Sequence, residues 1–176
     1  MGKLIDIHSH ILWGVDDGPD RLEETLQLLE YAVKEGITEI ISTSHSDHPY
    51  YDVNYQIIIN KINLLQGMLI EHRIPITIHE GHEVRLSENI ISNYQSNKIH
   101  TLANSQYLLL ELPSTTVPFY TENIIRDLLK EGITPIIAHP ERNKAIANQP
   151  SKLEKLIYSG ALAQITAGSL AGHFGK

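Results

Sequence analysis

The sequence predicts an α/β protein built on a parallel, barrel-like sheet, and three observations support this fold class. Strand-like and helix-like patterns alternate along the chain. The strand-like segments are apolar throughout, which is typical of parallel strands covered by helices. The pentapeptide Lys-Glu-Gly-Ile-Thr occurs at residues 34–38 and again at 130–134, each time followed by an apolar strand and a histidine. The repeat indicates one structural unit used twice, although it is also simply a good helix-stop signal.

The first elements are a strand, a helix and a second strand. Residues 4–7 form a strand-like segment that ends in two histidines. Asp20 with Glu23 three residues later has the form of a capping box, and leucines and a valine between 22 and 33 recur at helical spacing. Gly36 ends that helix, and residues 37–43 form the second strand.

The middle of the chain predicts a long helix, a strand and a short helix. Apolar residues recur at helical spacing between 57 and 69, and Pro75 opens a third strand at 76–78. Ser87 is the expected cap of a short helix through residues 90 and 91.

The last part of the chain repeats the strand and helix alternation. Residues 107–110 form a fully apolar fourth strand, and a helix over about 120–131 ends at Gly132 before the fifth strand, 133–138. Ser151 and Glu154 form another capping box, Gly160 closes that helix, and 161–166 is the sixth strand.

Composition limits the classes of function. The length of 176 residues suits one domain over residues 1–176. The formal net charge of −7 argues against nucleic acid as the main partner, because phosphate contacts need a basic surface. The chain has no cysteine, which excludes a disulfide framework and suits a reducing compartment. No signal segment or membrane-spanning window is evident, so we expect a cytoplasmic protein without membrane insertion.

Potential metal ligands follow the predicted strands. Parallel strands bring their carboxyl ends to one edge of a sheet, which is where sites are built. A single histidine or glutamate after a strand is commonly only part of a turn. The pair in His8-Ser9-His10, taken alone, is equally compatible with one histidine that caps the strand and one that is solvated. The coincidence at five strands favours a site. The candidates are His8 and His10 after the first strand, then His45, Glu83, Glu111 and His139.

This ligand set predicts more than one metal ion. Imidazole nitrogens and carboxylate oxygens without sulfur suit manganese, iron or zinc, and there are more ligands than one tetrahedral ion accepts. Closely spaced metals hydrolyse phosphate esters, because one ion lowers the pKa of water to ~7 while its neighbour stabilises the developing charge. Arg142, three residues beyond His139, is placed to grip phosphate oxygens. The alternative for Arg142 is a surface salt bridge with Glu141.

Several motifs in order resemble the polymerase-and-histidinol-phosphatase (PHP) superfamily, and most closely its bacterial protein tyrosine phosphatases encoded with capsule and exopolysaccharide genes. The motifs are Asp-Ile-His-Ser-His at 6–10, Asp-Asp-Gly-Pro at 16–19, Thr-Ser-His at 43–45, Gly-His-Glu-Val-Arg at 81–85, Leu-Glu-Leu-Pro at 110–113, Ala-His-Pro-Glu-Arg-Asn at 138–143 and Gln-Ile-Thr-Ala-Gly-Ser-Leu-Ala-Gly at 164–172.

The resemblance implies a distorted β/α (TIM-like) barrel of the PHP type and a manganese-dependent phosphatase with two to three ions. The implied substrate is phosphotyrosine on a cognate bacterial tyrosine kinase. Carried over by motif, the metal ligands are His8, His10, Asp17, His45, Glu83, Glu111 and His139. Glu83 is the expected bridge between ions, Arg142 binds the phosphate, and Arg142 and Asp17 are the expected catalytic residues.

Two departures from the family pattern stand out. The loop after His45 reads His-Ser-Asp-His, so His48 is interpreted as a loop residue and not a ligand. Relatives in this superfamily continue beyond this length with further barrel elements and a late motif whose aspartate and histidine complete two metal positions. We therefore expect a C-terminally truncated domain that lacks the last part of the barrel, with exposed sheet edges that pairing of chains could cover.

Three functions remain open from the sequence. The first is a metal-dependent protein-tyrosine phosphatase, with the activity of the shortened chain undecided. The second is a phosphoesterase for a small molecule of the histidinol-phosphate type. The third is a catalytically inactive binding fragment. Metal occupancy and the choice between an aryl and an alkyl phosphate distinguish the three.

Overall fold

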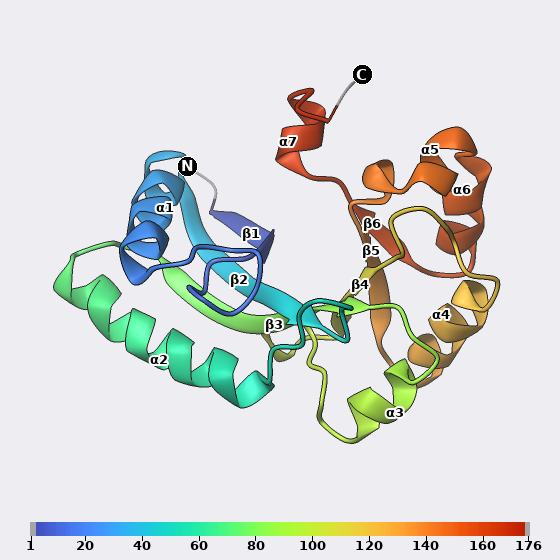
Figure 1. The fold of residues 1–176 in the computed structure, drawn as a ribbon, viewed down its shortest axis with the longest axis horizontal. Helices are drawn as coiled ribbons and strands as arrows, with labels where there is room; N and C mark the ends of the chain where they lie inside the picture. The colour runs from blue at the N-terminus through green and yellow to red at the C-terminus, as the bar shows by residue number, and fades with distance from the viewer. Residues whose placement is uncertain (1–2, 175–176) are drawn as a thin grey trace.

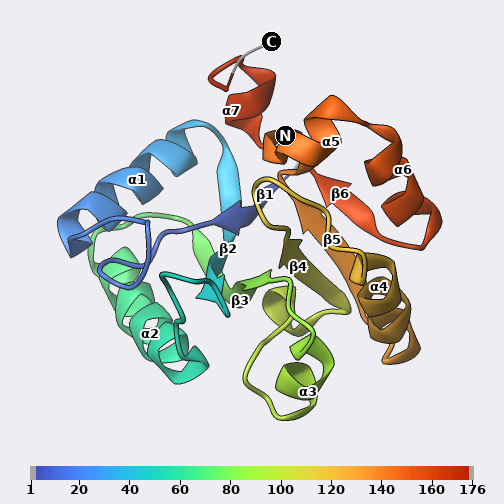
Figure 2. The same ribbon diagram turned by 45° about the vertical axis from the view of Figure 1, so that its right-hand side comes forward.

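The computed structural model describes residues 3–174 and confirms the α/β class (Figure 1). Six parallel strands form one sheet in the order of the sequence. They are β1 (Leu4–Ser9), β2 (Ile37–Ser46), β3 (Thr77–Arg85), β4 (Tyr107–Glu111), β5 (Thr134–Ala138) and β6 (Leu162–Gln164). The sheet curls into a half-barrel with the helices on its outer side (Figure 2).

The helices divide into two groups. In Figure 1, α1 and α2 lie on one side of the molecule and α4, α5 and α6 on the other. The helices are α1 (Leu22–Lys34), α2 (Tyr55–Glu71), α3 (Ile90–Gln95), α4 (Thr121–Lys130), α5 (Lys144–Asn148), α6 (Ser151–Tyr158) and α7 (Ala167–Leu170), with 3-10 turns η1 (Leu102–Asn104) and η2 (Pro140–Arg142). The sequence pattern does not predict α5, α7 or the two turns, because each is five residues or shorter and has little periodicity.

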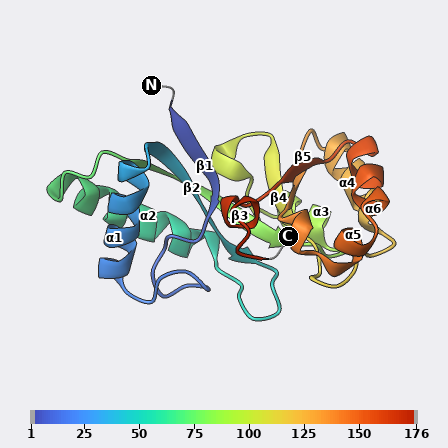
Figure 3. The same ribbon diagram turned by 90° about the horizontal axis from the view of Figure 1, so that it is seen from above.

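Two apolar clusters hold the helices against the outer face of the sheet. One joins β2, β3 and the loop after β1 to α1 and α2, and it includes Leu29, Ile40 and Leu65. The other joins β4 and β5 to α3, α4 and α6 and includes Leu110 and Ile125. The helices flank the sheet on the same two sides when the molecule is seen from above (Figure 3). Burial of these faces is the main source of stability for an α/β fold.

A third, smaller apolar cluster lies inside the curl. It contains Ile41 of β2, Leu109 of β4, Ile136 of β5 and Leu102 of η1. Successive side chains on a strand point to opposite faces, so residues two or four positions further along share the inner face with these apolar side chains. On β2 this places His45 on the inner face, and on β4 it places Glu111 there. The inner face is therefore apolar at one level and polar nearer the carboxyl ends of the strands.

The boundaries of β2 and β3 differ from the expected ones. We expected β2 to end at residue 43 and β3 at residue 78, but they run to Ser46 and Arg85. His45 and Glu83 therefore lie within paired strands and face each other across the β2–β3 ladder. The expected strands stopped where the apolar residues stop. In the structure the polar residues that follow remain in the strands, because their backbone N–H and C=O groups pair with the neighbouring strand.

The capping box expected from Asp20 and Glu23 is wrong. The N-cap of α1 is Arg21, and the carboxylate of Glu24 accepts hydrogen bonds from the backbone N–H groups of Asp20 and Arg21 at 3.0 and 3.3 Å. The Arg21 guanidinium also pairs with Glu24 at 2.8 Å and holds the carboxylate in place.

The other two expected caps are also displaced. Asn89 and not Ser87 precedes α3, and Ser87 instead donates to Asp47 at 3.3 Å. Pro150 precedes α6, so Ser151 is the first helical residue and not its cap. Proline fits the start of a helix because its missing N–H has no intrahelical partner there.

Candidate metal centre

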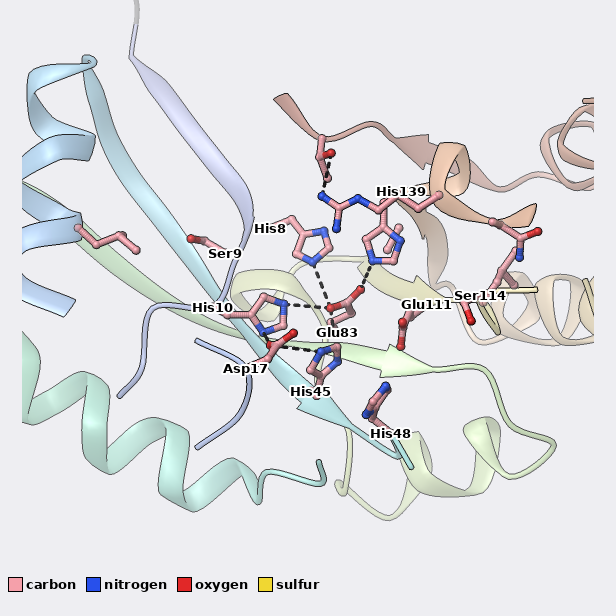
Figure 4. Close-up of a pocket in the computed structure, with 16 residues that line it drawn as sticks. His8, Ser9, His10, Asp17, His45, His48, Glu83, Glu111, Ser114 and His139 are labelled. Carbon is pink, nitrogen blue, oxygen red and sulfur yellow. Dashed lines mark hydrogen bonds and ion pairs between the residues drawn. The ribbon is translucent and has the colours of Figure 1, made fainter. Parts of the chain in front are cut away.

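The carboxyl ends of the strands enclose a cavity of about 560 Å³ (Figure 4). All seven predicted metal ligands line it, and so does Arg142. The ligands are His8, His10, Asp17, His45, Glu83, Glu111 and His139. The predicted site residues are therefore gathered in one place, although their contacts differ.

Glu83 is the centre of the cluster. Its Oε1 lies 2.8 Å from His139 Nε2, while its Oε2 lies 3.0 Å from His10 Nε2 and 3.1 Å from His8 Nε2. The side chain is only 1% exposed. Burial raises the pKa of the Glu83 carboxyl, but the hydrogen bonds from the histidines outweigh it and hold this pKa well below its ordinary range. Glu83 is therefore a carboxylate with two oxygens facing different imidazoles.

His45 completes the group on the β2 side. Its Nδ1 is 3.4 Å from Glu83 Oε2 and its Nε2 is 3.5 Å from Asp17 Oδ1. The Nδ1 atom is buried and has no hydrogen-bond partner among the described residues. Burial lowers the pKa of His45, which keeps the imidazole neutral near pH 7. A buried, neutral and unpartnered ring nitrogen is a suitable metal donor.

The loop between β1 and α1 contributes two aspartates with different environments. Asp17 is 55% exposed on its side chain, and its Oδ1 lies 3.2 Å from His10 Nδ1. The side chain of Asp16 is fully buried, and its Oδ2 lies 3.1 Å from the same Nδ1. Gly18 is required after them, because a Cβ there would lie 2.6 Å from the carbonyl oxygen of His10. Both aspartates belong to the Asp-Asp-Gly-Pro motif, and only Asp17 is a metal ligand predicted from it.

The two carboxylates around His10 change its titration. Burial lowers the pKa of His10, but the hydrogen bonds that His10 donates to the carboxylates of Asp16 and Glu83 outweigh it and raise this pKa to about 10. Correspondingly, burial raises the pKa of Asp16, and the contact with His10 lowers it below its ordinary value overall. Cationic charge at His10 is thus stabilised by its surroundings, and a metal cation would be stabilised by the same carboxylates.

His139 reaches Glu83 from the opposite side of the curl. It lies directly after β5 and precedes η2, with φ of 31° and ψ of 54°. This left-handed conformation is unfavourable for a residue with a Cβ and is concentrated at functional sites. The turn directs the His139 ring toward Glu83, as Figure 4 shows.

Glu111 and Arg142 line the cavity but have other partners. Glu111 Oε1 is 2.9 Å from Arg85 Nη1, while Glu111 Oε2 is buried and has no hydrogen-bond partner within residues 3–174. The Arg142 guanidinium donates to Thr166 Oγ1 at 3.1 Å and lies 4.0 Å from the Phe174 ring centroid.

The alternative of a salt bridge between Arg142 and Glu141 is wrong. The Glu141 carboxylate instead accepts hydrogen bonds from the hydroxyls of Thr166 and Ser169 at 3.1 and 2.7 Å. Arg142 is therefore not neutralised by its sequence neighbour.

His48 is closer to the site than the sequence suggested. It was interpreted as a loop residue, and it does lie in the loop after β2, but its side chain lines the cavity. Its ring stacks on His45 with centroids 4.6 Å apart, and Tyr51 lies nearly parallel to both rings. The only feature of the sequence that pointed to a role for this loop is its aromatic residues. Whether their rings face the cavity depends on the loop conformation, which the sequence pattern does not give.

The residues present fit divalent metal ions. Two groups of three have donor atoms within 4.8 Å of one another, namely His8, Glu83 and His139, and His10, Asp17 and His45. Glu83 contacts imidazoles on both sides, and in the described part of the chain the buried atoms His45 Nδ1 and Glu111 Oε2 have no hydrogen-bond partner. Mixed nitrogen and oxygen donors suit manganese, iron or zinc.

The fold and this site define a parallel α/β protein with a histidine and carboxylate centre suited to divalent metals. The chain belongs to the family described as capsular polysaccharide synthesis, CpsB/CapC, which matches residues 4–176. This agrees with the resemblance found in the sequence motifs.

Individual relatives are similar over nearly the whole of this chain. It is 41% identical to CapC of Staphylococcus aureus and 38% identical to the tyrosine-protein phosphatase YwqE of Bacillus subtilis, covering 98% of this chain and 68% of each relative. A solved structure, described as YwqE from B. subtilis and CpsB from Streptococcus pneumoniae, metal-dependent tyrosine phosphatases, superposes with a TM-score of 0.95. Its identity is 38%, over 98% of this chain and 70% of that one.

Proposed function

We propose that this chain is the phosphatase domain of a metal-dependent protein-tyrosine phosphatase that acts on a bacterial tyrosine kinase in the control of capsule or exopolysaccharide synthesis. The observation that carries the proposal is the convergence of imidazoles on both oxygens of Glu83. The names of the relatives supply the substrate class. We also propose that the half-barrel is of the PHP type, with residues 1–176 as one domain and the cytoplasm as its location.

The metal centre of the proposal uses the residues gathered around Glu83. We assign two to three Mn²⁺ ions, with iron or zinc as substitutes, to His8, His10, Asp17, His45, Glu83, Glu111 and His139. Glu83 is the proposed bridge because its two oxygens face different imidazoles. Divalent metals supply Lewis acidity and lower the pKa of water, which is the chemistry that phosphate-ester hydrolysis needs.

Arg142 and Asp17 are the proposed catalytic residues. The Arg142 guanidinium lines the cavity and offers planar N–H donors that match the nonbridging oxygens of a phosphate. Asp17 reaches the cavity from its solvent side, where its Oδ1 can accept a hydrogen bond from an attacking water. One residue holds the phosphate and the other orients the nucleophile.

The rings beside the cavity favour an aryl phosphate over an alkyl one. His45, His48 and Tyr51 have centroids within 5.7 Å of one another and interplanar angles of 25° or less. A phenyl ring entering beside His48 would meet an aromatic surface. The phenolate of tyrosine, whose conjugate acid has a pKa of ~10, leaves with only modest acid assistance.

The test compares two substrates in the presence of Mn²⁺. The wild-type chain should hydrolyse a phosphotyrosine peptide much faster than a small alkyl phosphate, and His139→Ala should lose the activity. His72→Ala, an exposed histidine at the end of α2, is the matched control and should retain it. Faster turnover of the alkyl phosphate would favour the small-molecule phosphoesterase, and metal binding without any turnover would favour a binding fragment.

A further inference from the structure

The two histidines of the β1 motif share a hydrogen-bonding pattern that the proposed function does not use. Both rings direct Nε2 toward Glu83 Oε2, at 3.1 Å for His8 and 3.0 Å for His10. Both rings also have an acceptor at the other nitrogen, Nδ1. For His10 it is Asp16 at 3.1 Å, and for His8 it is Gln164 at 2.9 Å.

Asp16 is held so that it can only accept from His10. Its side chain is fully buried, its Oδ1 accepts from the backbone N–H of Gly18 at 3.1 Å, and its Oδ2 also accepts from the backbone N–H of His45 at 3.2 Å. An ionised carboxylate has no proton to donate. The hydrogen bond to Asp16 therefore uses a hydrogen on Nδ1 of His10. The other nitrogen, Nε2, faces Glu83 at 3.0 Å, and a metal cation bound there would take the place of the proton between the ring and the carboxylate.

The orientation of Gln164 is fixed by a second hydrogen bond. Its Nε2 donates to the carbonyl oxygen of Ile165 at 3.1 Å, so its Oε1 is the atom that faces His8. Gln164 ends β6, whereas His8 lies in β1, at the other end of the strand order. The contact therefore joins the first and last described strands across the curl of the sheet.

We propose that Asp16 and Gln164 are positioning residues that fix His10 and His8 in the Nδ1–H tautomer, so that both rings present Nε2 to the metal centre. This inference rests on the metal centre of the proposed function, and it gives the two adjacent aspartates different roles. Asp17 binds metal directly, whereas Asp16 acts through His10. Outer hydrogen-bond partners of ligating histidines set both ring orientation and ligand basicity.

The first test is metal affinity in two conservative variants. Both substitutions keep the side-chain size. Asp16→Asn removes the negative charge and replaces one of the two acceptor oxygens with an NH2 group, whereas Gln164→Leu removes the acceptor altogether. Each should weaken Mn²⁺ and Zn²⁺ binding about 10–100-fold in a calorimetric titration. Asp127→Asn and Gln95→Leu, exposed residues away from the cavity, should not. Wild-type affinity in both test variants would overturn the proposal. A wild-type chain that binds neither metal would overturn the proposed metal centre itself.

The second test reads the tautomer directly and does not depend on any variant folding. Long-range ¹H–¹⁵N correlations on the Zn²⁺-loaded wild-type protein, labelled at histidine and assigned through ring-to-backbone correlations, should show Nδ1–H for His8 and His10. In folded Asp16→Asn the His10 pattern alone should change. A purely structural role would lower the melting temperature without changing the tautomer. Observation of Nε2–H at both histidines in the wild-type protein would overturn the proposal.

Discussion

The two halves of the site treat their carboxylates differently. In the half built by β1–β3, Glu83 contacts only imidazoles among its ion-pair partners within residues 3–174. In the half built by β4–β6, Glu111 pairs with Arg85 and Glu141 accepts from hydroxyl groups.

A carboxylate surrounded by imidazoles is available to a cation, because an imidazole can give up its proton to make room for a metal. A carboxylate paired with an arginine is already neutralised, because the guanidinium keeps its charge. A position at the end of a strand therefore does not by itself make a glutamate a metal ligand. The partner that the fold supplies decides how much cation affinity remains.

The largest effect should come from Glu83→Gln. The change removes the negative charge that the imidazoles on both sides of Glu83 share. Mn²⁺ affinity and phosphatase activity should therefore each fall by well over ~100-fold, which is the upper end of the loss expected when only a hydrogen-bond partner of a ligating histidine is removed. Calorimetric titration and turnover of a phosphotyrosine peptide measure the two losses. Glu80→Gln is the control, since three positions along the same strand place it on the opposite face. Normal Mn²⁺ binding by Glu83→Gln would place the centre elsewhere.

Arg85→Leu tests whether the arginine partner of Glu111 limits the affinity of this glutamate for a cation. It leaves Glu111 without its partner in a mostly buried place, where the two side chains are 17% and 12% exposed. We expect a loss of about 2–3 kcal/mol in unfolding free energy, less than for a fully buried pair. If Glu111 is a metal ligand, Mn²⁺ should restore more stability to this variant than to the wild type.

Chemical denaturation with and without Mn²⁺ measures the Arg85→Leu effect. Arg126→Leu, which disrupts an exposed pair with Glu122 at 4.0 Å, should change stability very little. Equal Mn²⁺ stabilisation of wild type and Arg85→Leu would remove Glu111 from the ligand set.

His82 should produce a pH-dependent effect of intermediate size. It neighbours Glu83 on β3 but is satisfied by backbone groups, accepting from His100 N–H at 3.1 Å and donating to Val53 carbonyl at 3.2 Å. Burial lowers its pKa to about 4, from an ordinary value of 6.5. Between these values the unfolded chain binds a proton that the folded protein does not, so stability falls as the pH falls.

The size of the His82 contribution can be isolated by difference. From pH 7 to pH 5 it should cost about 2 kcal/mol of unfolding free energy, and His82→Gln should lose this part of the pH dependence. Urea denaturation of both proteins at the two pH values gives the comparison. Identical pH slopes would show that His82 does not titrate as its surroundings imply.

The smallest predicted effect concerns Thr166→Val. Removing the hydroxyl deletes the hydrogen bond that holds Arg142, so inorganic phosphate should inhibit about fivefold more weakly, which corresponds to one net hydrogen bond. The inhibition constant measures this change, and the melting temperature checks the helix cap that Thr166 also provides. Thr38→Val, which loses a hydroxyl far from the cavity, is the control. An unchanged inhibition constant would mean that Arg142 needs no support from Thr166.

None of the helices between residues 3 and 174 combines the length and the apolar composition that a membrane crossing requires. Helices α1, α2 and α4 are amphipathic, and their apolar faces pack in the clusters that cover the sheet. Helical spacing of leucine and isoleucine was therefore sufficient to find α1, α2 and α4 from the sequence.

The sequence by itself determined the α/β class, the six strands and the candidate ligands. These follow from local causes: helical periodicity, glycine stops, and polar residues after apolar strands. The tertiary structure alone decided which atoms meet. Gln164 contacts His8 from the other end of the sheet, and Asp16 contacts His10 because the loop after β1 turns back toward it. Arg85 pairs with one oxygen of Glu111. Side-chain direction and charge pairing depend on the curl of the sheet and on the loop after β1, which no local pattern specifies.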